Sequence, residues 1–107
     1  METEERLDAI FLALSDSRRR VLLAELAAGP KSVNQLAAIV NMKLSAASKH
    51  IAVLEVASLL YKTRNGREVH CHLNFDVWRE VVNYIAMHAT FWAGRLDELE
   101  AHLKLHH

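Results

Sequence analysis

The side chains with the clearest chemistry in this sequence are cationic and hydroxyl groups near the middle of the chain. They fall on one expected helix and on the hairpin that follows it: Lys43, Ser45, Ala46, Ser48, Lys49, His50, Lys62, Arg64 and Arg67. Lys and Arg neutralise phosphates, Ser hydrogen-bonds base edges or phosphates, and Ala lets a helix approach a partner closely. Each of these residues, taken by itself, is also typical of a solvent-exposed surface. His50, taken by itself, is also typical of a buried histidine whose hydrogen bonds are made within the core. Their joint position favours DNA binding.

The distribution of charge supports the same interpretation. The chain has 13 Lys and Arg and 13 Asp and Glu, so its formal net charge is zero. Residues 29–74 carry six bases and two acids, a net charge of +4, whereas both ends of the chain are acidic. A uniformly basic coat is excluded, but a local positive field still attracts an anionic partner.

Length and composition limit the class of protein. With 107 residues, the chain is expected to form a single domain over residues 1–107. The one cysteine, Cys71, excludes an intramolecular disulfide and favours a reducing compartment. The longest apolar run, residues 9–14, is far shorter than the ~20 residues that cross a bilayer, and no signal-peptide pattern is visible. We therefore expect a cytoplasmic protein with no membrane partner.

The periodicity of apolar residues places the basic side chains on a helix-turn-helix. Apolar residues recur at helical spacing in four segments, which predicts helices at residues 4–14, 17–28, 33–40 and 44–57. Ser32 and Gln35 form a capping-box pattern at the start of the third helix. The third and fourth helices are joined by a short polar connection, as in a helix-turn-helix. The candidate DNA-binding helix is therefore the fourth.

A change of period follows this helix and predicts a β-hairpin. Two β-rich runs, residues 60–64 and 68–73, flank Asn65 and Gly66, and this dipeptide is the strongest short-range hairpin signal. A last helix is expected at residues 76–105. The predicted fold is mainly α with a small β-hairpin wing, a winged helix-turn-helix of about five helices and two strands.

The last expected helix is too long to be covered by its own domain. Its apolar seam repeats every 3.5 residues, which is typical of helices that pack against one another. Thirty helical residues span ~45 Å, whereas a domain of this size has a radius of gyration near ~13 Å. A twofold homodimer would bury the seam and part of the first helix. The expected dimerisation residues are Leu7, Phe11, Trp78, Val82, Ile85, Phe91, Trp92, Leu96 and Leu99. The alternative is a monomer in which the first helix alone covers the seam.

Several stretches of the sequence resemble one family. These are residues 11–16, Arg19 and Arg20, residues 32–37, residues 48–55 and the hairpin tip at residues 65–67. Together they make the chain similar, over essentially its whole length, to the ArsR/SmtB family of bacterial winged-helix repressors. The resemblance implies a helical homodimer that binds a palindromic double-stranded DNA operator, and many members release DNA when a metal or another small inducer binds. It places Ser48, Lys49 and His50 on the recognition helix, and Arg64 and Arg67 on the wing.

Three positions depart from the family pattern. Lys43 stands where a capping Ser is usual, and Ser45 where Pro is frequent, so the recognition helix starts at either residue. Ser58 stands where a Gly often ends that helix. This substitution is expected to cost stability without changing the function of the helix.

No cofactor is predicted, and metal binding is not favoured. The third helix lacks the Cys pair of the family's thiolate sensors, and His88 and His102 do not have the spacing of its other metal sites. The remaining candidates are His70 and His72, which strand alternation places on one face of the hairpin, opposite Cys71. The alternative functions are a metal- or redox-responsive regulator that uses His70, Cys71 and His72, and a dimerisation or adaptor module that does not bind DNA.

An enzyme is not expected. The sequence contains no nucleophile-elbow glycine pattern and no phosphate-binding loop, and only three glycines in all. An adaptor module would not need the basic helix and hairpin, and so these features favour a DNA-binding protein.

Overall fold

The computed structural model describes residues 3–105, which form two compact units divided between Val77 and Trp78. Residues 1–2 and 106–107 of the expected domain lie outside the described residues. The elements in chain order are α1 (Thr3–Ala13), α2 (Ser17–Ala27), β1 (Lys31–Ser32), α3 (Val33–Ile39), α4 (Leu44–Val56), β2 (Leu60–Asn65), β3 (Glu68–Leu73) and α5 (Phe75–Leu105). The predicted helices and hairpin are confirmed. The short strand β1 was not predicted.

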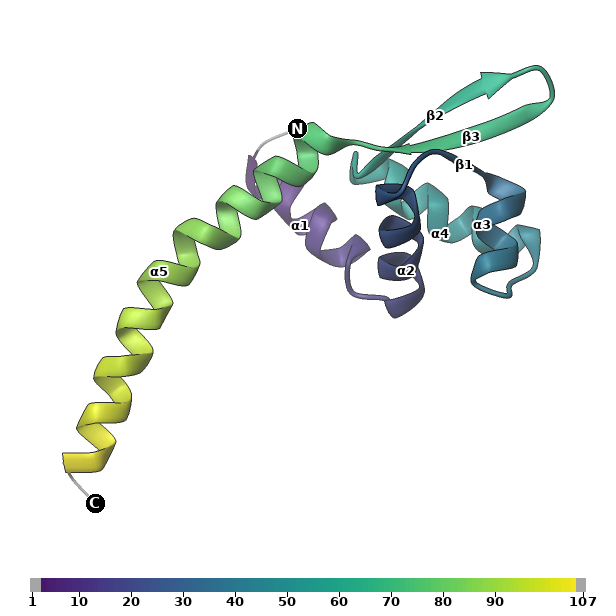
Figure 1. The fold of residues 1–107 in the computed structure, drawn as a ribbon. Coiled ribbons are helices and arrows are strands. Elements are labelled where there is room, and N and C mark those ends of the chain that lie inside the picture. The colour runs from purple at the N-terminus through teal and green to yellow at the C-terminus, as the bar shows by residue number, and fades with distance from the viewer. Residues whose placement is uncertain (1–2, 106–107) are drawn as a thin grey trace. The chain divides into compact units, whose positions relative to one another are not determined.

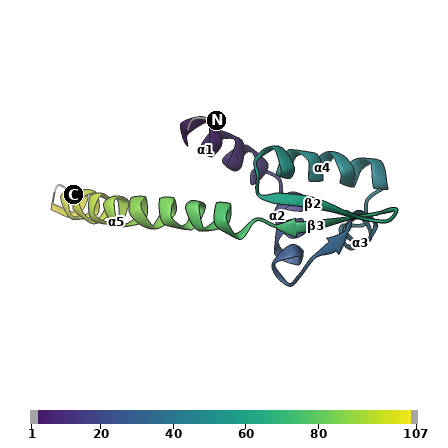
Figure 2. The ribbon, with the colours of Figure 1, turned by 90° about the horizontal axis from the view of Figure 1, so that it is seen from above.

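The first unit consists of four helices and one antiparallel sheet with the strand order β1-β3-β2. The sheet lies along one side of the helices, and the turn between β2 and β3 stands away from them (Figure 1). Viewed from above, β2 and β3 run alongside α4 (Figure 2). Leu60 pairs with Leu73, and Lys62 pairs with Cys71. Because facing residues share a side of the sheet, the buried Cys71 shows that Lys62 is on the helix-facing side.

The hairpin turn lies one residue further along the chain than the sequence predicts. Asn65 is the last residue of β2 and pairs with Glu68, so the two-residue loop consists of Gly66 and Arg67. Gly66 has a φ of 65°, a value that favours glycine, at the first loop position. As a result, the Arg67 side chain is at the tip of the wing.

The core explains why these segments fold together. Each helix of the first unit buries one apolar stripe, and the sheet contributes the inward residues of β2 and β3. The largest fully buried side chains of this unit are Ile10, Leu22, Leu26, Leu36, Ile51, Leu54, Leu59, Leu60 and Cys71. The Ser32 capping box predicted for α3 is present: Ser32 Oγ accepts from the Gln35 N–H at 3.1 Å, and Gln35 Oε1 accepts from the Ser32 N–H at 2.8 Å.

Two polar residues mark the ends of α4. Its N-cap is Lys43, whose side chain makes no capping hydrogen bond, and its first helical residue is Leu44. The helix therefore begins at Leu44, between the two starting residues that the sequence left open, and Lys43 is its N-cap. At the other end, Ser58 follows the C-cap Ala57 and has a φ of 60°. This left-handed conformation is the one in which glycine is usually found after a helix.

Replacing Ser58 with glycine is expected to stabilise the protein by about 0.5 to 1 kcal/mol, because the left-handed conformation strains a residue with a Cβ. A domain of this size then melts a few degrees higher. Thermal unfolding followed by circular dichroism measures the effect. The matched control is Ser45→Gly, in the first turn of α4, which should lower the melting temperature. A Ser58→Gly protein that melts at a lower temperature than the wild type contradicts the interpretation.

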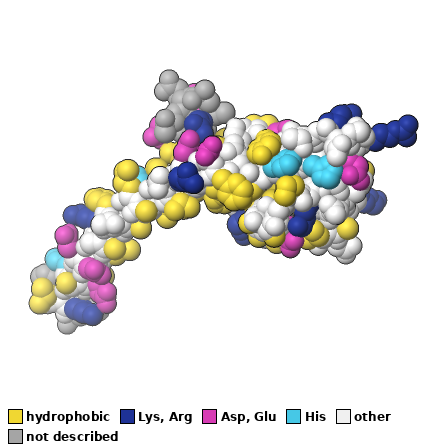
Figure 3. All heavy atoms as spheres, turned by 45° about the horizontal axis from the view of Figure 1, so that its top comes forward, with side chains coloured by type: hydrophobic (Ala, Val, Ile, Leu, Met, Phe, Trp, Pro, Cys, Tyr) yellow, Lys and Arg dark blue, Asp and Glu magenta, His cyan; other side chains and the backbone are white. Residues whose placement is uncertain are grey.

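The second unit is the part of α5 that begins at Trp78. In this unit hydrophobic side chains (yellow) run along the surface of the helix (Figure 3). Most seam residues are more than half exposed, including Ile85, Trp92 and Leu96. A helix of 31 residues with an open apolar seam is the outcome that the 3.5-residue period predicts. Among residues 3–105, no helix is both long and apolar enough to cross a membrane.

Candidate nucleic-acid interface

The N-terminal half of α4 presents its polar side chains to solvent. Ala47 and Ile51 point into the core and fix the orientation of the helix. Ser45, Ser48 and Lys49 are exposed as a consequence. Of the other predicted residues on this segment, Lys43 is exposed at the N-cap, and Ala46 is half-buried. The helix therefore offers hydroxyl groups and two cations to solvent, together with the half-exposed side chain of Leu44.

A groove of about 310 Å³ lies between this helix and the wing. Three of the predicted DNA-binding residues line it, namely Ser48 from α4, Lys62 from β2 and Arg67 from the hairpin tip. The other lining residues are Ser32, Val33, Asn34, Leu44, Glu68 and Val69. The groove therefore has two cations, the carboxylate of Glu68, and hydroxyl and amide groups. Its cations and hydrogen-bond donors suit a phosphate backbone, which accepts hydrogen bonds and carries negative charge.

The wing is basic, but its cations differ in how much they are already paired. Arg64 and Arg67 are exposed, and Lys and Arg side chains (dark blue) are visible at the far end of the hairpin (Figure 3). Lys62 Nζ instead lies 3.3 Å from Glu55 Oε1 of α4. This ion pair connects the wing to the second half of α4 and partly neutralises Lys62. We expect the two arginines to contribute more than Lys62 to the attraction of an anion.

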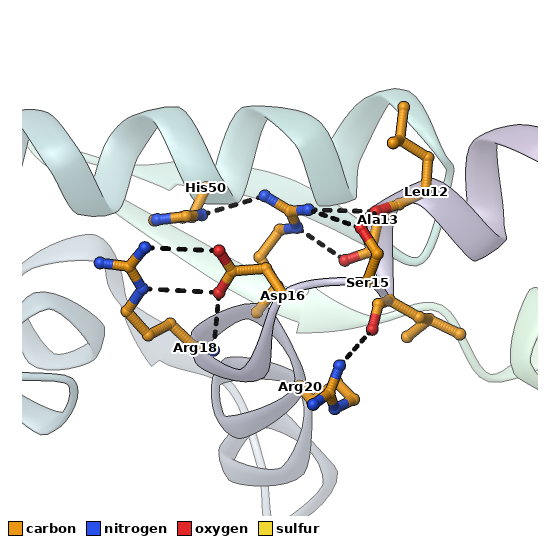
Figure 4. A network of polar contacts seen from close by, with 9 residues as sticks. Leu12, Ala13, Ser15, Asp16, Arg18, Arg20 and His50 are labelled. Carbon is orange, nitrogen blue, oxygen red and sulfur yellow. Dashed lines mark hydrogen bonds and ion pairs between the residues drawn. The ribbon is translucent and has the colours of Figure 1, made fainter.

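His50 differs from its neighbours on α4. It is half-buried, and its Nδ1 lies 3.2 Å from Nη1 of Arg19 in α2. In Figure 4, a dashed line joins the His50 ring to this guanidinium, and dashed lines from the other side of the guanidinium run to the end of α1. In the sequence, Arg19 stands out only through the family resemblance. Its contact joins residues 31 positions apart, and local periodicity does not reveal such a pair.

The same corner contains a charged N-cap. Asp16 caps α2 by accepting from the Arg18 N–H at 2.8 Å, and it also pairs with the Arg18 guanidinium (Figure 4). The hydrogen bonds from the Arg18 side chain and backbone lower the pKa of Asp16 to about 2. The carboxylate is therefore charged at neutral pH and fixes the start of α2, the helix that carries Arg19.

The candidate metal ligands do not form one site with the cysteine. His70 Nε2 lies 3.0 Å from Glu68 Oε2, and His72 Nε2 lies 2.8 Å from Thr63 Oγ1, both on the outer face of the sheet. Cys71 is on the opposite face and is fully buried, and this burial raises the pKa of its thiol. A buried thiol with a raised pKa lacks the thiolate character of a redox sensor. Within residues 3–105, no group of three or more His, Cys, Asp or Glu side chains is arranged to hold a metal ion.

The fold and this surface define a class of protein, the winged helix-turn-helix regulators of transcription. Residues 14–61 match the family described as "Helix-turn-helix domain". The structure is similar to that of an ArsR family transcriptional regulator, with a TM-score of 0.77 and 32% identity, covering 86% of this chain and 95% of that one. The chain belongs to the ArsR family of winged helix-turn-helix transcriptional regulators.

Two other similar proteins are a transcriptional repressor and a DNA-binding domain. The chain is 27% identical over 79 residues to the transcriptional repressor SdpR of Bacillus subtilis strain 168, covering 74% of this chain and 88% of that protein. It also resembles a homodimeric winged helix-turn-helix DNA-binding domain from Mycobacterium bovis, described as a possible ArsR-family regulator, with a TM-score of 0.67 and 26% identity. That match covers 80% of this chain and 82% of the other. The family and the fold are those of DNA-binding transcriptional regulators.

Proposed function

We propose that this protein is a transcriptional repressor that binds a palindromic DNA operator as a homodimer. In each protomer, the exposed N-terminal half of α4 enters the major groove, and the β2–β3 wing lies on the neighbouring backbone. The observation that carries the proposal is the groove in which Ser48, Lys62 and Arg67 come together beside the exposed Lys49. Repression itself is proposed by analogy with SdpR, which is named a repressor.

The homodimer is proposed from the surface that one chain leaves exposed. Over α5 the exposed seam residues include Val82, Trp92 and Leu99, and Phe11 of α1 is 43% exposed. Large apolar side chains exposed along the length of a helix are typical of protein–protein interfaces. The Mycobacterium bovis relative is described as homodimeric. In this proposal residues 1–107 form a single DNA-binding domain, with dimerisation helices at its N- and C-terminal ends.

The proposal is tested by a gel-shift titration of the purified protein against the DNA upstream of its own gene. An unrelated duplex of equal length serves as the control. We expect a specific complex with two protomers per site and an affinity that falls steeply as salt rises, because bound phosphates release counterions. Adding zinc to a parallel titration tests for metal response. Equal affinity for both duplexes contradicts a sequence-specific repressor.

A further inference from the structure

The Arg19 side chain connects three helices of the first unit. Its Nε donates to the Ala13 carbonyl at 2.6 Å, and its Nη2 donates to the Leu12 carbonyl at 3.0 Å, both at the end of α1. Its Nη1 faces His50 Nδ1 of α4 at 3.2 Å. Arg19 is itself in the first turn of α2 and is half-buried. One guanidinium therefore holds the end of α1 and the middle of α4 in a fixed relation (Figure 4).

The chemistry of this contact determines the state of His50. A guanidinium only donates hydrogen bonds and stays charged at any pH a protein encounters. For this contact to be a hydrogen bond, the Nδ1 of His50 must accept, which requires the tautomer that carries its proton on Nε2. Because the five donors of arginine have a rigid planar arrangement, a lysine at position 19 cannot bind the α1 carbonyls and His50 at the same time.

We infer that Arg19 is a positioning residue for DNA recognition, which sets the orientation of α4 and the tautomer of His50. The inference rests on the proposed function, because it concerns how the recognition helix is presented to the operator. Its expected effect is indirect. Losing the contact lets α4 shift against the end of α1, which misplaces Ser48 and Lys49 without removing either side chain. Operator affinity then falls although every residue on the exposed face is intact.

The chain provides a matched control in the next residue. Arg20 also lies in α2, and its Nη1 donates to the Leu14 carbonyl at 2.6 Å. It therefore holds the same corner between α1 and α2 as Arg19 does, and it is likewise a cation. Among the residues that the structure describes, Arg20 makes no hydrogen bond to α4. Comparing the two arginines separates a general effect on the corner from an effect transmitted to the recognition helix.

The experiment is a double-mutant cycle on operator binding with Arg19→Lys, His50→Ala and the combined variant. We expect each single variant to bind about fivefold more weakly, the size of one lost hydrogen bond. The combined variant should bind more tightly than the product of the two single losses predicts, because both single variants remove the contact between Arg19 and His50. His50→Gln, whose amide oxygen can accept from Arg19, should retain most of the affinity, and Arg20→Ala should stay within twofold of the wild type.

Salt dependence shows whether Arg19 acts directly. The slope of affinity against salt should stay at the wild-type value in Arg19→Lys, because the residue is not expected to contact a phosphate. Additive losses in the double-mutant cycle, or an Arg20→Ala loss equal to that of Arg19→Lys, overturn the inference.

Amide hydrogen exchange of α4 gives a readout that does not need DNA. Arg19→Lys and His50→Ala should raise exchange in the first two turns of α4 about fivefold, and Arg20→Ala should not. A wild-type protein that binds no operator overturns the proposed function. The exchange comparison then still shows, without DNA, whether Arg19 holds α4 in position. Unchanged exchange in both variants shows that Arg19 does not position α4.

Discussion

Lys49→Ala is expected to weaken operator binding about tenfold while leaving the protomers folded and dimeric. Lys49 is exposed on the half of α4 that is proposed to enter the major groove, between Ser48 and the half-buried His50. A lysine at this place contributes mainly by neutralising a phosphate, so the slope of log affinity against log salt should fall by about one. Alanine is the best helix former and preserves α4. Fluorescence anisotropy of a labelled operator at several salt concentrations measures both quantities.

Three further variants make this prediction specific. Arg67→Ala removes the exposed cation at the hairpin tip and should resemble Lys49→Ala. Lys62→Ala should reduce the salt slope less, because Glu55 already pairs with this lysine. Lys104→Ala, in the last turn of α5, changes the net charge by the same amount outside the proposed interface and should have no effect. Wild-type affinity in both Lys49→Ala and Arg67→Ala would count against DNA binding through this surface.

The elements of the fold could be predicted wherever residues close together in the sequence determine the structure. The helices of the first unit were predicted from apolar spacing and caps, and the Ser32 capping box is present as expected. The strand β1 was missed because two residues, Lys31 and Ser32, are too few to show a period. They become a strand only by pairing with Cys71 and His70, about forty positions later. The turn was predicted one residue too early because Asn65 pairs with Glu68 and extends β2.

In the candidate interface too, the sequence predicts the residue types of the surface but not the partners that packing gives them. The sequence predicts that nine residues between Lys43 and Arg67 share one surface, and the structure brings Ser48, Lys62 and Arg67 of this set into one groove. The sequence did not reveal that His50 contacts Arg19, or that Lys62 is paired with Glu55. Those partners depend on how α2, α4 and β2 pack. A charge seen in a sequence indicates what a side chain can bind, whereas packing decides whether that capacity is already used.

Trp92→Ala is expected to have the largest effect, the dissociation of the proposed dimer into protomers of 12.1 kDa. Trp92 is 57% exposed in the single chain, so removing its indole from a monomer should cost little. In a dimer sealed along the seam the indole would be buried, and truncating a buried Trp costs roughly 3 to 5 kcal/mol. The dissociation constant of the dimer then rises by at least about 100-fold. Sedimentation velocity at micromolar concentration measures this change.

The Trp92→Ala variant should also bind the operator more weakly, because a dissociated protomer contacts only half of a palindromic site. The matched control is Met87→Ala, which removes another large apolar side chain from the same helix. Met87 is 72% exposed and lies off the seam that contains Ile85 and Trp92, so its loss should leave both the dimer and the DNA affinity unchanged. The core of the first unit does not include Trp92, and its unfolding should therefore be similar in the two variants. A Trp92→Ala protein that remains dimeric at micromolar concentration shows that the protomers associate through a different surface.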